Sequence, residues 1–184
     1  MQPILKINLT TGTTEEYAIP KEWERDFLGG ASLAARILYP YLTKELDPLS
    51  PESPLLFING PLTGTSGPTT GRFVICGKSP ATNLWAESNI GGFWGPELRK
   101  AGYDGLWITG KSETPVYLWI EEGRLEVRNA AGVWGKDVYD AQEIVKEGVG
   151  VNGARVAVIG EAGERGVLYS SICCDHGRMA GRTG

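Results

Sequence analysis

Glycine is the residue that most constrains how this chain can fold. It accounts for 26 of the 184 residues, about twice the average usage of roughly 7%. The glycines lie between apolar runs and not in a low-complexity tract. Because glycine reaches left-handed backbone conformations and lets two backbones approach closely, this distribution indicates many tight turns between short strands. We therefore expect a β-rich, folded chain.

Residues 174–184 place Arg178 and Arg182 among three glycines. Backbone N–H groups in such a segment can reach a ligand closely, and a guanidinium matches phosphate oxygens. The segment therefore predicts a loop that holds an anionic, phosphorylated ligand. Since chain ends are usually solvated, we expect residues beyond Gly184 to complete the site.

Charge and composition exclude several classes of function. The formal net charge is −4 and the isoelectric point about 5.1, which argues against nucleic acid as a partner. No apolar run reaches the roughly 20 residues of a membrane span, and no signal peptide opens the chain. We expect a cytoplasmic protein without a membrane partner.

Cysteine and histidine offer little to catalysis. The three cysteines are Cys76, Cys173 and Cys174, an odd number with two adjacent, which suits neither a disulfide framework nor a tetrahedral metal site. We expect Cys173 and Cys174 to end a strand as inert thiols. His176 is the single histidine, and we interpret it as a structural hydrogen-bonding group.

Hydrophobic periodicity predicts an α+β fold. Strands and hairpins prevail, with a helix indicated by the apolar stripe from Leu33 to Tyr41 and another capped by Asp137. A shorter helix is expected to start near Pro96. The predicted strands are residues 4–9, 14–19, 55–58, 72–77, 84–88, 105–109, 116–120, 124–128, 155–159 and 166–173.

One segment permits a dinucleotide-binding interpretation. Residues 156–166 place three glycines after an apolar strand, but with the spacing G-x-x-G-x-x-G instead of G-x-G-x-x-G. The residues that follow are strand-like and not helical. We favour a glycine-rich turn between two strands.

Two loops could share one ligand. Residues 88–92 and 177–184 both follow a predicted strand, and both carry glycine with Asn or Arg. Two glycines directly before a helix also make a helix start that can receive an anion; a plain left-handed turn is the alternative. Arg72 opens a strand after the polar loop 59–71, although a single arginine is often only solvated.

Three ordered motifs carry a resemblance to a known family. They are GRFVICGKSP at residues 71–80, SNIGGFWGPELRKAGYDG at 88–105 and DHGRMAGRTG at 175–184. In order and spacing they resemble the N-terminal domain of the aldehyde:ferredoxin oxidoreductase family, the tungsten-pterin enzymes. The likeness covers nearly the whole chain.

The resemblance implies a β-rich domain of two similar sheets related by a pseudo-twofold, on which two metallopterins lie. Residues 1–184 would be a tungstopterin-binding N-terminal domain, with no catalytic residue of its own. A magnesium ion bridging the pterin phosphates would take the backbone carbonyls of Asn89 and Met179. The cofactor-binding residues that the resemblance implies are Arg72, Asn89, Gly91, Arg178, Met179, Gly181 and Arg182.

The resemblance also implies what this chain lacks. The family's [4Fe–4S] cluster requires a C-x-x-C-x-x-x-C group that is not found here, so the iron–sulfur and substrate domains would lie outside the chain, and the chain alone would be inactive. The whole enzyme, expected to be a homo-oligomer, would oxidise an aldehyde to a carboxylic acid and pass electrons through the cluster to ferredoxin. The alternatives are an aryl-CoA reductase of the same family, or a phosphate-ligand binding module without redox activity.

Overall fold

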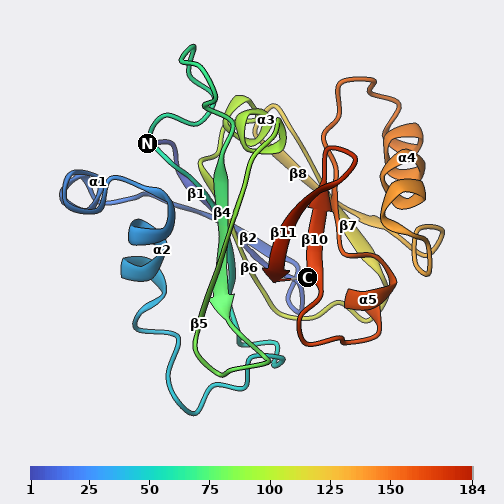
Figure 1. The fold of residues 1–184 in the computed structure, drawn as a ribbon, viewed down its shortest axis with the longest axis horizontal. Coiled ribbons are helices and arrows are strands. Elements are labelled where there is room, and N and C mark those ends of the chain that lie inside the picture. Colours follow the sequence, from blue (N-terminus) through green and yellow to red (C-terminus); the bar gives the residue numbers. More distant parts are fainter. Residues whose placement is uncertain (184) are drawn as a thin grey trace.

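The computed structural model describes residues 1–183, apart from the side chain of Arg182, and has a β-rich α+β fold with a few short helices (Figure 1). The predicted fold class is confirmed. The helices are α1 (Lys21–Phe27), α2 (Gly30–Leu38), α3 (Trp94–Lys100), α4 (Val138–Val149) and α5 (Gly160–Glu164). The strands are β1 (Ile4–Asn8), β2 (Thr13–Tyr17), β3 (Leu55–Asn59), β4 (Phe73–Lys78), β5 (Trp85–Ile90), β6 (Gly105–Thr109), β7 (Val116–Glu121), β8 (Arg124–Asn129), β9 (Ala157–Val158), β10 (Ser171–Cys174) and β11 (Arg178–Thr183).

The largest sheet has six strands in the order β2-β1-β6-β3-β4-β5. β1 and β6 run parallel, and the other neighbours are antiparallel. Every residue of β4 is buried, which fits its nearly unbroken apolar sequence, since a strand covered on both faces has no polar side. β5 is the edge strand and alternates exposed and buried residues.

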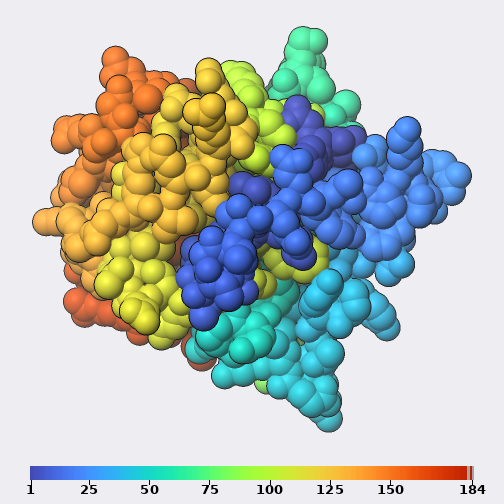
Figure 2. All heavy atoms as spheres, turned by 180° about the vertical axis from the view of Figure 1, so that it is seen from behind, coloured from blue at the N-terminus to red at the C-terminus, as the bar shows by residue number. Residues whose placement is uncertain are grey.

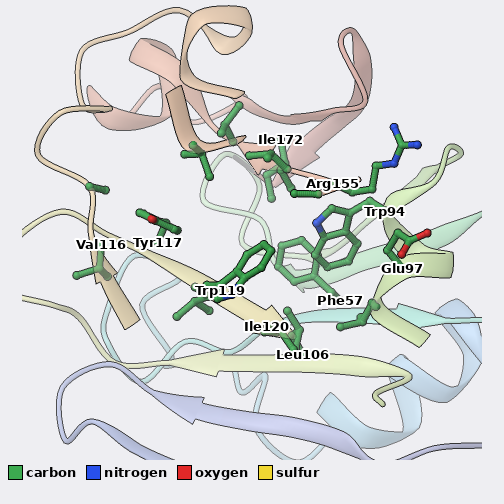
Figure 3. A pocket seen from close by; sticks show the side chains of 18 of the residues that line it. Phe57, Trp94, Glu97, Leu106, Val116, Tyr117, Trp119, Ile120, Arg155 and Ile172 are labelled. Atoms are coloured by element: carbon green, nitrogen blue, oxygen red, sulfur yellow. The ribbon is translucent and has the colours of Figure 1, made fainter. Parts of the chain in front are cut away.

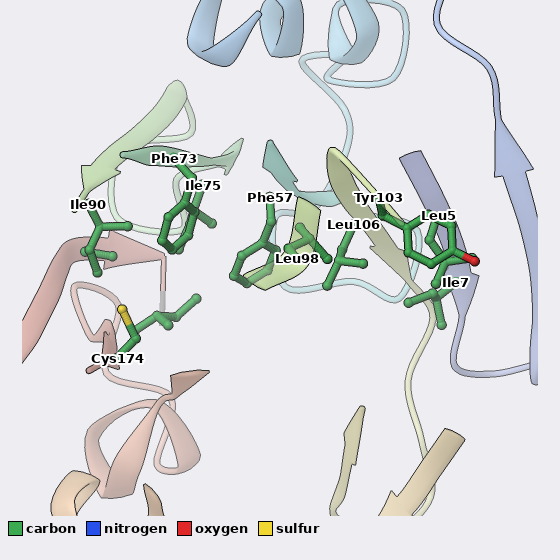
Figure 4. Packing of buried hydrophobic residues seen from close by; sticks show 12 residues of the cluster. Leu5, Ile7, Phe57, Phe73, Ile75, Ile90, Leu98, Tyr103, Leu106 and Cys174 are labelled. Atoms are coloured by element: carbon green, nitrogen blue, oxygen red, sulfur yellow. The ribbon is translucent and has the colours of Figure 1, made fainter. Parts of the chain in front are cut away.

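Each face of this sheet has its own apolar core. On one face, α1 and α2 cover a cluster that includes Leu33, Ile37 and Trp107. The other face carries a second cluster, in which Phe57, Phe73, Leu98 and Leu106 meet Cys174 from the C-terminal part of the chain (Figure 4). The second cluster therefore fixes how the C-terminal elements lie on the sheet.

The C-terminal part contributes a three-stranded antiparallel sheet, β11-β10-β9, and the separate hairpin β7–β8. β11 packs beside β5, the edge of the large sheet. In Figure 1 the hairpins β4–β5 and β10–β11 lie next to each other, with α4 and α5 on the far side of β10. Figure 2 shows the opposite face of the molecule, where the N-terminal hairpin lies beside residues of the β7–β8 region.

Most predicted elements are present with small shifts of their ends. Asp137 caps α4 as predicted, because its side chain accepts hydrogen bonds from the amides of Tyr139 and Asp140. α2 ends at Leu38, before Pro40, which cannot continue a helix hydrogen-bond ladder. Asn89, predicted in a turn, belongs to β5 and pairs with Val74.

The last third of the chain differs from the prediction. The predicted strand 155–159 is reduced to β9, and a short helix, α5, begins at Gly160 where a turn between strands was expected. β9 pairs antiparallel with β10, so the segment is not a dinucleotide-binding βαβ unit either. β10 begins only at Ser171, because residues 166–170 form turns with exposed side chains at Leu168 and Tyr169.

The predicted terminal loop 177–184 is also wrong for its larger part, since residues 178–183 form β11. β10 has buried side chains at Ile172, Cys173 and Cys174, and its backbone needs a partner on its second edge. Residues 175–177 turn the chain back with positive φ angles, so β11 pairs with β10. Gly184 lies outside the described residues.

Among the described residues, no helix is long and apolar enough to cross a membrane.

Candidate functional site

Arg72 is held at the end of the loop 59–71 by hydrogen bonds within that loop. The Thr63 hydroxyl donates to the Arg72 carbonyl at 2.6 Å and accepts the Gly60 amide at 3.0 Å. Arg99 of α3 donates to three carbonyls of the same loop, those of Gly60, Pro61 and Thr63. The loop therefore has a fixed shape, and it places the Arg72 backbone at the entry to β4.

The Arg72 side chain lies against Asn89 of the neighbouring strand. Its Nε donates to Asn89 Oδ1 at 2.5 Å, and its Nη2 donates to the Asn89 carbonyl at 3.1 Å. These two bonds fix the guanidinium beside the end of β5. A carbonyl oxygen has two lone pairs, so the Asn89 carbonyl keeps capacity for a second partner, such as the predicted magnesium ion.

Arg178, at the start of β11, reaches the same place from the other sheet. A Cβ built on Gly91 would lie 3.4 Å from Arg72 Nη1 and 3.8 Å from Arg178 Nη1. Two guanidinium groups that are distant in sequence therefore converge over one glycine. Arg72, Asn89, Gly91 and Arg178, predicted to share a site, are brought together.

Neither arginine forms an ion pair with a carboxylate among the described residues, although Asp175 lies close to Arg178. Both Arg72 and Arg178 are exposed. Two like charges held close together repel each other, and an anion bound between them would relieve that repulsion. The arrangement suits a phosphate group, which accepts charge-assisted hydrogen bonds from guanidinium donors.

Glycine is required here because backbones and side chains approach very closely. A Cβ on Gly71 would overlap the carbonyl oxygen of Gly92. A Cβ on Gly92 would overlap Asp175 Oδ2 and lie 2.8 Å from Arg178 Cδ, and its φ of +130° is one that other residues rarely adopt. Gly91 is the glycine that was predicted to contact the cofactor, whereas Gly71 and Gly92 are the more closely packed positions.

The helix start after Gly92 already holds an anion, the carboxylate of Asp175. Its Oδ2 accepts the amide of Phe93 at 2.7 Å and that of Trp94 at 3.3 Å. The anion-receptive helix start that the sequence suggested is thus filled by the protein itself. An external anion has to be bound by the arginines and by the remaining backbone groups.

Met179 and Gly181 are not joined to this cluster by any contact between described side chains. The Met179 side chain is half exposed, and its sulfur lies 3.7 Å from the Ser171 hydroxyl. Gly181 has a positive φ in the part of β11 where the pairing with β10 shifts, with open space around it. The Arg182 side chain lies outside the described residues.

His176 has the structural surroundings that its context suggested. Its amide donates to Gln142 Oε1 at 3.1 Å, and its Nε2 lies 2.8 Å from Glu143 Oε1 and 2.6 Å from Lys146 Nζ. All three partners belong to α4. The hydrogen bond from Lys146 is the main reason that the pKa of Glu143 lies below its usual value. His176 therefore anchors the turn between β10 and β11 to α4.

The cysteines are buried free thiols. Burial raises the pKa of Cys76 to about 12, and burial together with the nearby Asp175 carboxylate raises that of Cys174 to about 12. Both remain protonated at neutral pH and are poor nucleophiles and metal ligands. Within the described part of the chain, no three His, Cys, Asp or Glu side chains are grouped to hold a metal ion.

A separate apolar cavity of about 630 Å³ lies between the large sheet and the hairpin β7–β8. The rings of Phe57 and Trp94 pack side by side in its wall, with Trp119 beside them, while Arg155 and Glu97 lie at its edge (Figure 3). Its middle offers few polar groups to a charged ligand. This cavity is the space between the large sheet and the β7–β8 hairpin, and it is separate from the place where Arg72 and Arg178 converge.

Comparison with known proteins places this geometry in a family. The model of the aldehyde ferredoxin oxidoreductase N-terminal domain matches residues 4–184. The chain belongs to the aldehyde ferredoxin oxidoreductase family. It corresponds to the N-terminal domain of that family, as the three sequence motifs indicated.

Several relatives are named as tungsten-containing aldehyde ferredoxin oxidoreductases. The chain is 42% identical over 181 residues to the tungsten-containing aldehyde ferredoxin oxidoreductase of Pyrococcus abyssi, covering 98% of this chain and 30% of that protein. It is 35% identical over 188 residues to the WOR-like subunit of an aliphatic sulfonate oxidoreductase of Pyrococcus furiosus, covering 92% of this chain and 29% of that subunit.

A solved structure shares the whole fold. The active-site complex BamBC of a benzoyl-coenzyme A reductase, in complex with 1,5-dienoyl-CoA, aligns with a TM-score of 0.95 and 39% identity, covering 100% of this chain and 28% of that chain. The chain thus spans about 30% of the length of the family's oxidoreductases that it matches.

Sequence reasoning missed two contributors to the site, Asp175 and Arg155. Asp175 was part of a recognised motif but received no role, because a carboxylate beside two arginines does not suggest an anion site. Arg155 lies 3.6 Å from Asp175 Oδ1 and 4.6 Å from the centre of the Phe93 ring. Arg155 lies in the irregular segment directly before β9, which has no periodic signal that could have identified it.

Proposed function

We propose that this chain binds the phosphate ends of a tungsten-pterin cofactor in an aldehyde ferredoxin oxidoreductase-type enzyme. One observation carries the proposal: the guanidinium groups of Arg72 and Arg178 converge over Gly91 without a carboxylate partner among the described residues. A ligand with phosphate groups supplies the negative charge that this arrangement lacks.

Each residue has a part in this proposal. Arg72 and Arg178 donate to phosphate oxygens, while Gly91 admits the ligand close to the backbone. Gly181 and Arg182 extend the contact along β11. The backbone carbonyls of Asn89 and Met179 would hold a magnesium ion, in keeping with the preference of magnesium for few protein ligands and for phosphate oxygens.

When bound, the cofactor supplies two-electron redox chemistry at tungsten. Residues 1–184 act as its N-terminal binding domain: they hold and orient it and surround it with positive charge, as proteins generally do for redox cofactors. We place the [4Fe–4S] cluster and the substrate pocket in the parts of the enzyme beyond this chain, which alone is expected to be inactive.

For the whole enzyme we propose oxidation of an aldehyde to a carboxylic acid, with ferredoxin as the electron acceptor, in a cytoplasmic homo-oligomer. The second candidate is reduction of an aromatic acyl-coenzyme A. It is supported by the 39% identity to the benzoyl-coenzyme A reductase complex, close to the 42% identity to the Pyrococcus abyssi enzyme. A phosphate-binding module without redox activity is weakened by relatives that are oxidoreductases.

The test uses the natural-length protein, purified without oxygen, from a host that makes the cofactor. We expect bound tungsten and pterin, both lost in the double variant Arg72→Gln/Arg178→Gln, and viologen reduction that depends on an aldehyde. Turnover only with an aromatic acyl-coenzyme A would favour the second candidate. A protein without tungsten or pterin would contradict both.

A further inference from the structure

We propose that Asp175 is a positioning residue that fixes Arg178 over the phosphate site. Its carboxylate links the turn after β10 to the start of α3 by hydrogen bonds. These bonds hold Arg178, which follows the turn, in a fixed position relative to Gly91, which precedes the helix. The inference rests on the proposed phosphate-binding role of Arg72 and Arg178, and it assigns a function to a carboxylate that lies close to Arg178.

The Asp175 side chain contacts a segment that is distant in the sequence. Asp175 follows β10 directly, and its side chain is only 5% exposed. Its Oδ2 accepts the amides of Phe93 and Trp94, which are 82 and 81 residues away along the chain, at 2.7 and 3.3 Å. A single carboxylate thus joins the loop that carries Gly91 to the turn that leads into Arg178.

The charge of this buried carboxylate is balanced by an arginine. Oδ1 accepts no hydrogen bond, and its charge partner is the Arg155 guanidinium at 3.6 Å. The same guanidinium stacks on the Phe93 ring, 4.6 Å from its centre. A buried carboxylate is stable only with donors and a counter-charge. Asp175 has amide donors and the Arg155 counter-charge, and Arg155 also packs on the Phe93 ring.

The Arg178 side chain passes close to Gly92 and to this carboxylate. Cδ and Nε of Arg178 would lie 2.8 and 3.3 Å from a Cβ on Gly92, and Asp175 Oδ2 would overlap that Cβ. The stem of Arg178 and the carboxylate therefore pack against the same glycine from adjoining positions. This contact limits the directions in which Arg178 can extend and leaves its guanidinium beside Gly91.

Positioning and simple electrostatics predict opposite effects at this residue. A negative charge near an anion site repels the anion, so removing that charge would strengthen anion binding if Coulomb forces alone mattered. If Asp175 positions Arg178, removing the carboxylate frees the arginine and weakens anion binding, because the donors lose their preorganised geometry. Whether phosphate affinity falls or rises on removal of the carboxylate therefore distinguishes positioning from simple electrostatics.

The experiment titrates inorganic phosphate into the 184-residue chain at constant ionic strength and follows the arginine Nε–H signals by NMR. We expect Asp175→Asn to weaken phosphate binding by about tenfold, the loss of one charge-assisted contact. Asp175→Glu keeps the charge but displaces the carboxylate, and it should weaken binding in the same direction. If Asp175→Asn does not fold, Asp175→Glu decides the question.

The matched control is Asp137→Asn, which removes the same charge from a carboxylate that also accepts two backbone amides, at the start of α4. Its phosphate affinity should equal that of the wild type. In a double-mutant cycle, Asp175→Asn should have no further effect, within about twofold, when Arg178 is already Gln, because Asp175 acts through that arginine.

Each outcome is decisive. Weaker binding by Asp175→Asn that disappears in the Arg178→Gln background supports the inference. Tighter or unchanged binding, or an effect that persists without Arg178, overturns it while the proposed function stands. Absence of saturable phosphate binding in the wild type overturns the proposed function and this inference with it.

Discussion

At the scale of single residues, the site depends on where a side chain is missing. Gly92 lies against both the Asp175 carboxylate and the stem of Arg178, so any Cβ there would push the two apart. Its φ of +130° adds backbone strain for any other residue. This glycine therefore serves both the stability of the fold and the geometry of the arginine cluster.

We expect Gly92→Ala to destabilise the chain by about 2 kcal/mol or more, from backbone strain and overlap together. Gly132→Ala is the matched control, because its Cβ would meet no atom within 4 Å and its φ is not positive, and its effect should stay within about 0.5 kcal/mol. Urea unfolding of both variants measures the difference. Equal stability of the two variants would show that the close approach at Gly92 is not as described.

The buried thiols give the chain a pH dependence with a defined sign. Burial raises the pKa of Cys76 and Cys174 to about 12, above the value of about 8.5 for an unfolded thiol. The folded state thus keeps its protons when the unfolded state loses them, and stability falls as pH rises from about 8.5 toward 12.

Urea unfolding at pH 7 and at pH 10 should show this loss of stability, and Cys76→Ala/Cys174→Ala should have a flatter pH dependence. Iodoacetamide at pH 8 should modify the native thiols far more slowly than those in urea. Rapid labelling of the native chain would mean that these side chains are open to solvent.

At the scale of elements, α4 shows that glycine can destabilise a helix at one position and stabilise its end at another. Gly148 lies within the helix with an ordinary φ and open space around it, whereas Gly150 ends the helix in the left-handed conformation with φ of 70°. A helix interior disfavours glycine, and a left-handed helix end favours it.

Gly148→Ala should therefore raise the free energy of unfolding by about 0.5 kcal/mol, and Gly150→Ala should lower it by about 1 kcal/mol. Thermal or urea unfolding of the two variants tests the pair. A change of the free energy of unfolding in the same direction for both variants would contradict the position of the helix end at Gly150. The two variants differ from the wild type by one methyl group each, so composition cannot explain opposite effects.

Local sequence signals predicted the elements of the large sheet well and the C-terminal ones poorly. β3, β4, β6 and α4 follow apolar runs or a clear cap, which are local properties. β9 and β10 are short strands whose ends are set by pairing with β11 and by packing on the large sheet. Such ends depend on contacts distant in the sequence, which no local pattern contains.

For the candidate site, the sequence predicted the anion-binding residue types, and the motifs predicted the family. It could not predict that Asp175 fills the start of α3, because that contact joins residues 82 positions apart. It also favoured a loop for β11, since glycine is uncommon in strands. Pairing with β10 overrides that local preference.

At the scale of the whole molecule, the site lies where two sheets meet. β5 is the edge of the large sheet, and β11 of the small sheet packs beside it (Figure 1). Arg72 lies directly before β4 of the first sheet and Arg178 begins β11 of the second, so the charge cluster exists only when both sheets are assembled. The fold thus builds an anion site from segments that are far apart in sequence.

Calorimetric titration of the 184-residue chain with inorganic phosphate tests this account most directly. We expect saturable binding that weakens by about tenfold or more in Arg72→Gln and in Arg178→Gln. Arg124→Gln, an exposed arginine of the hairpin β7–β8, should bind as the wild type does. Equal phosphate affinity in all four proteins would contradict the claim that the two sheets form one phosphate site.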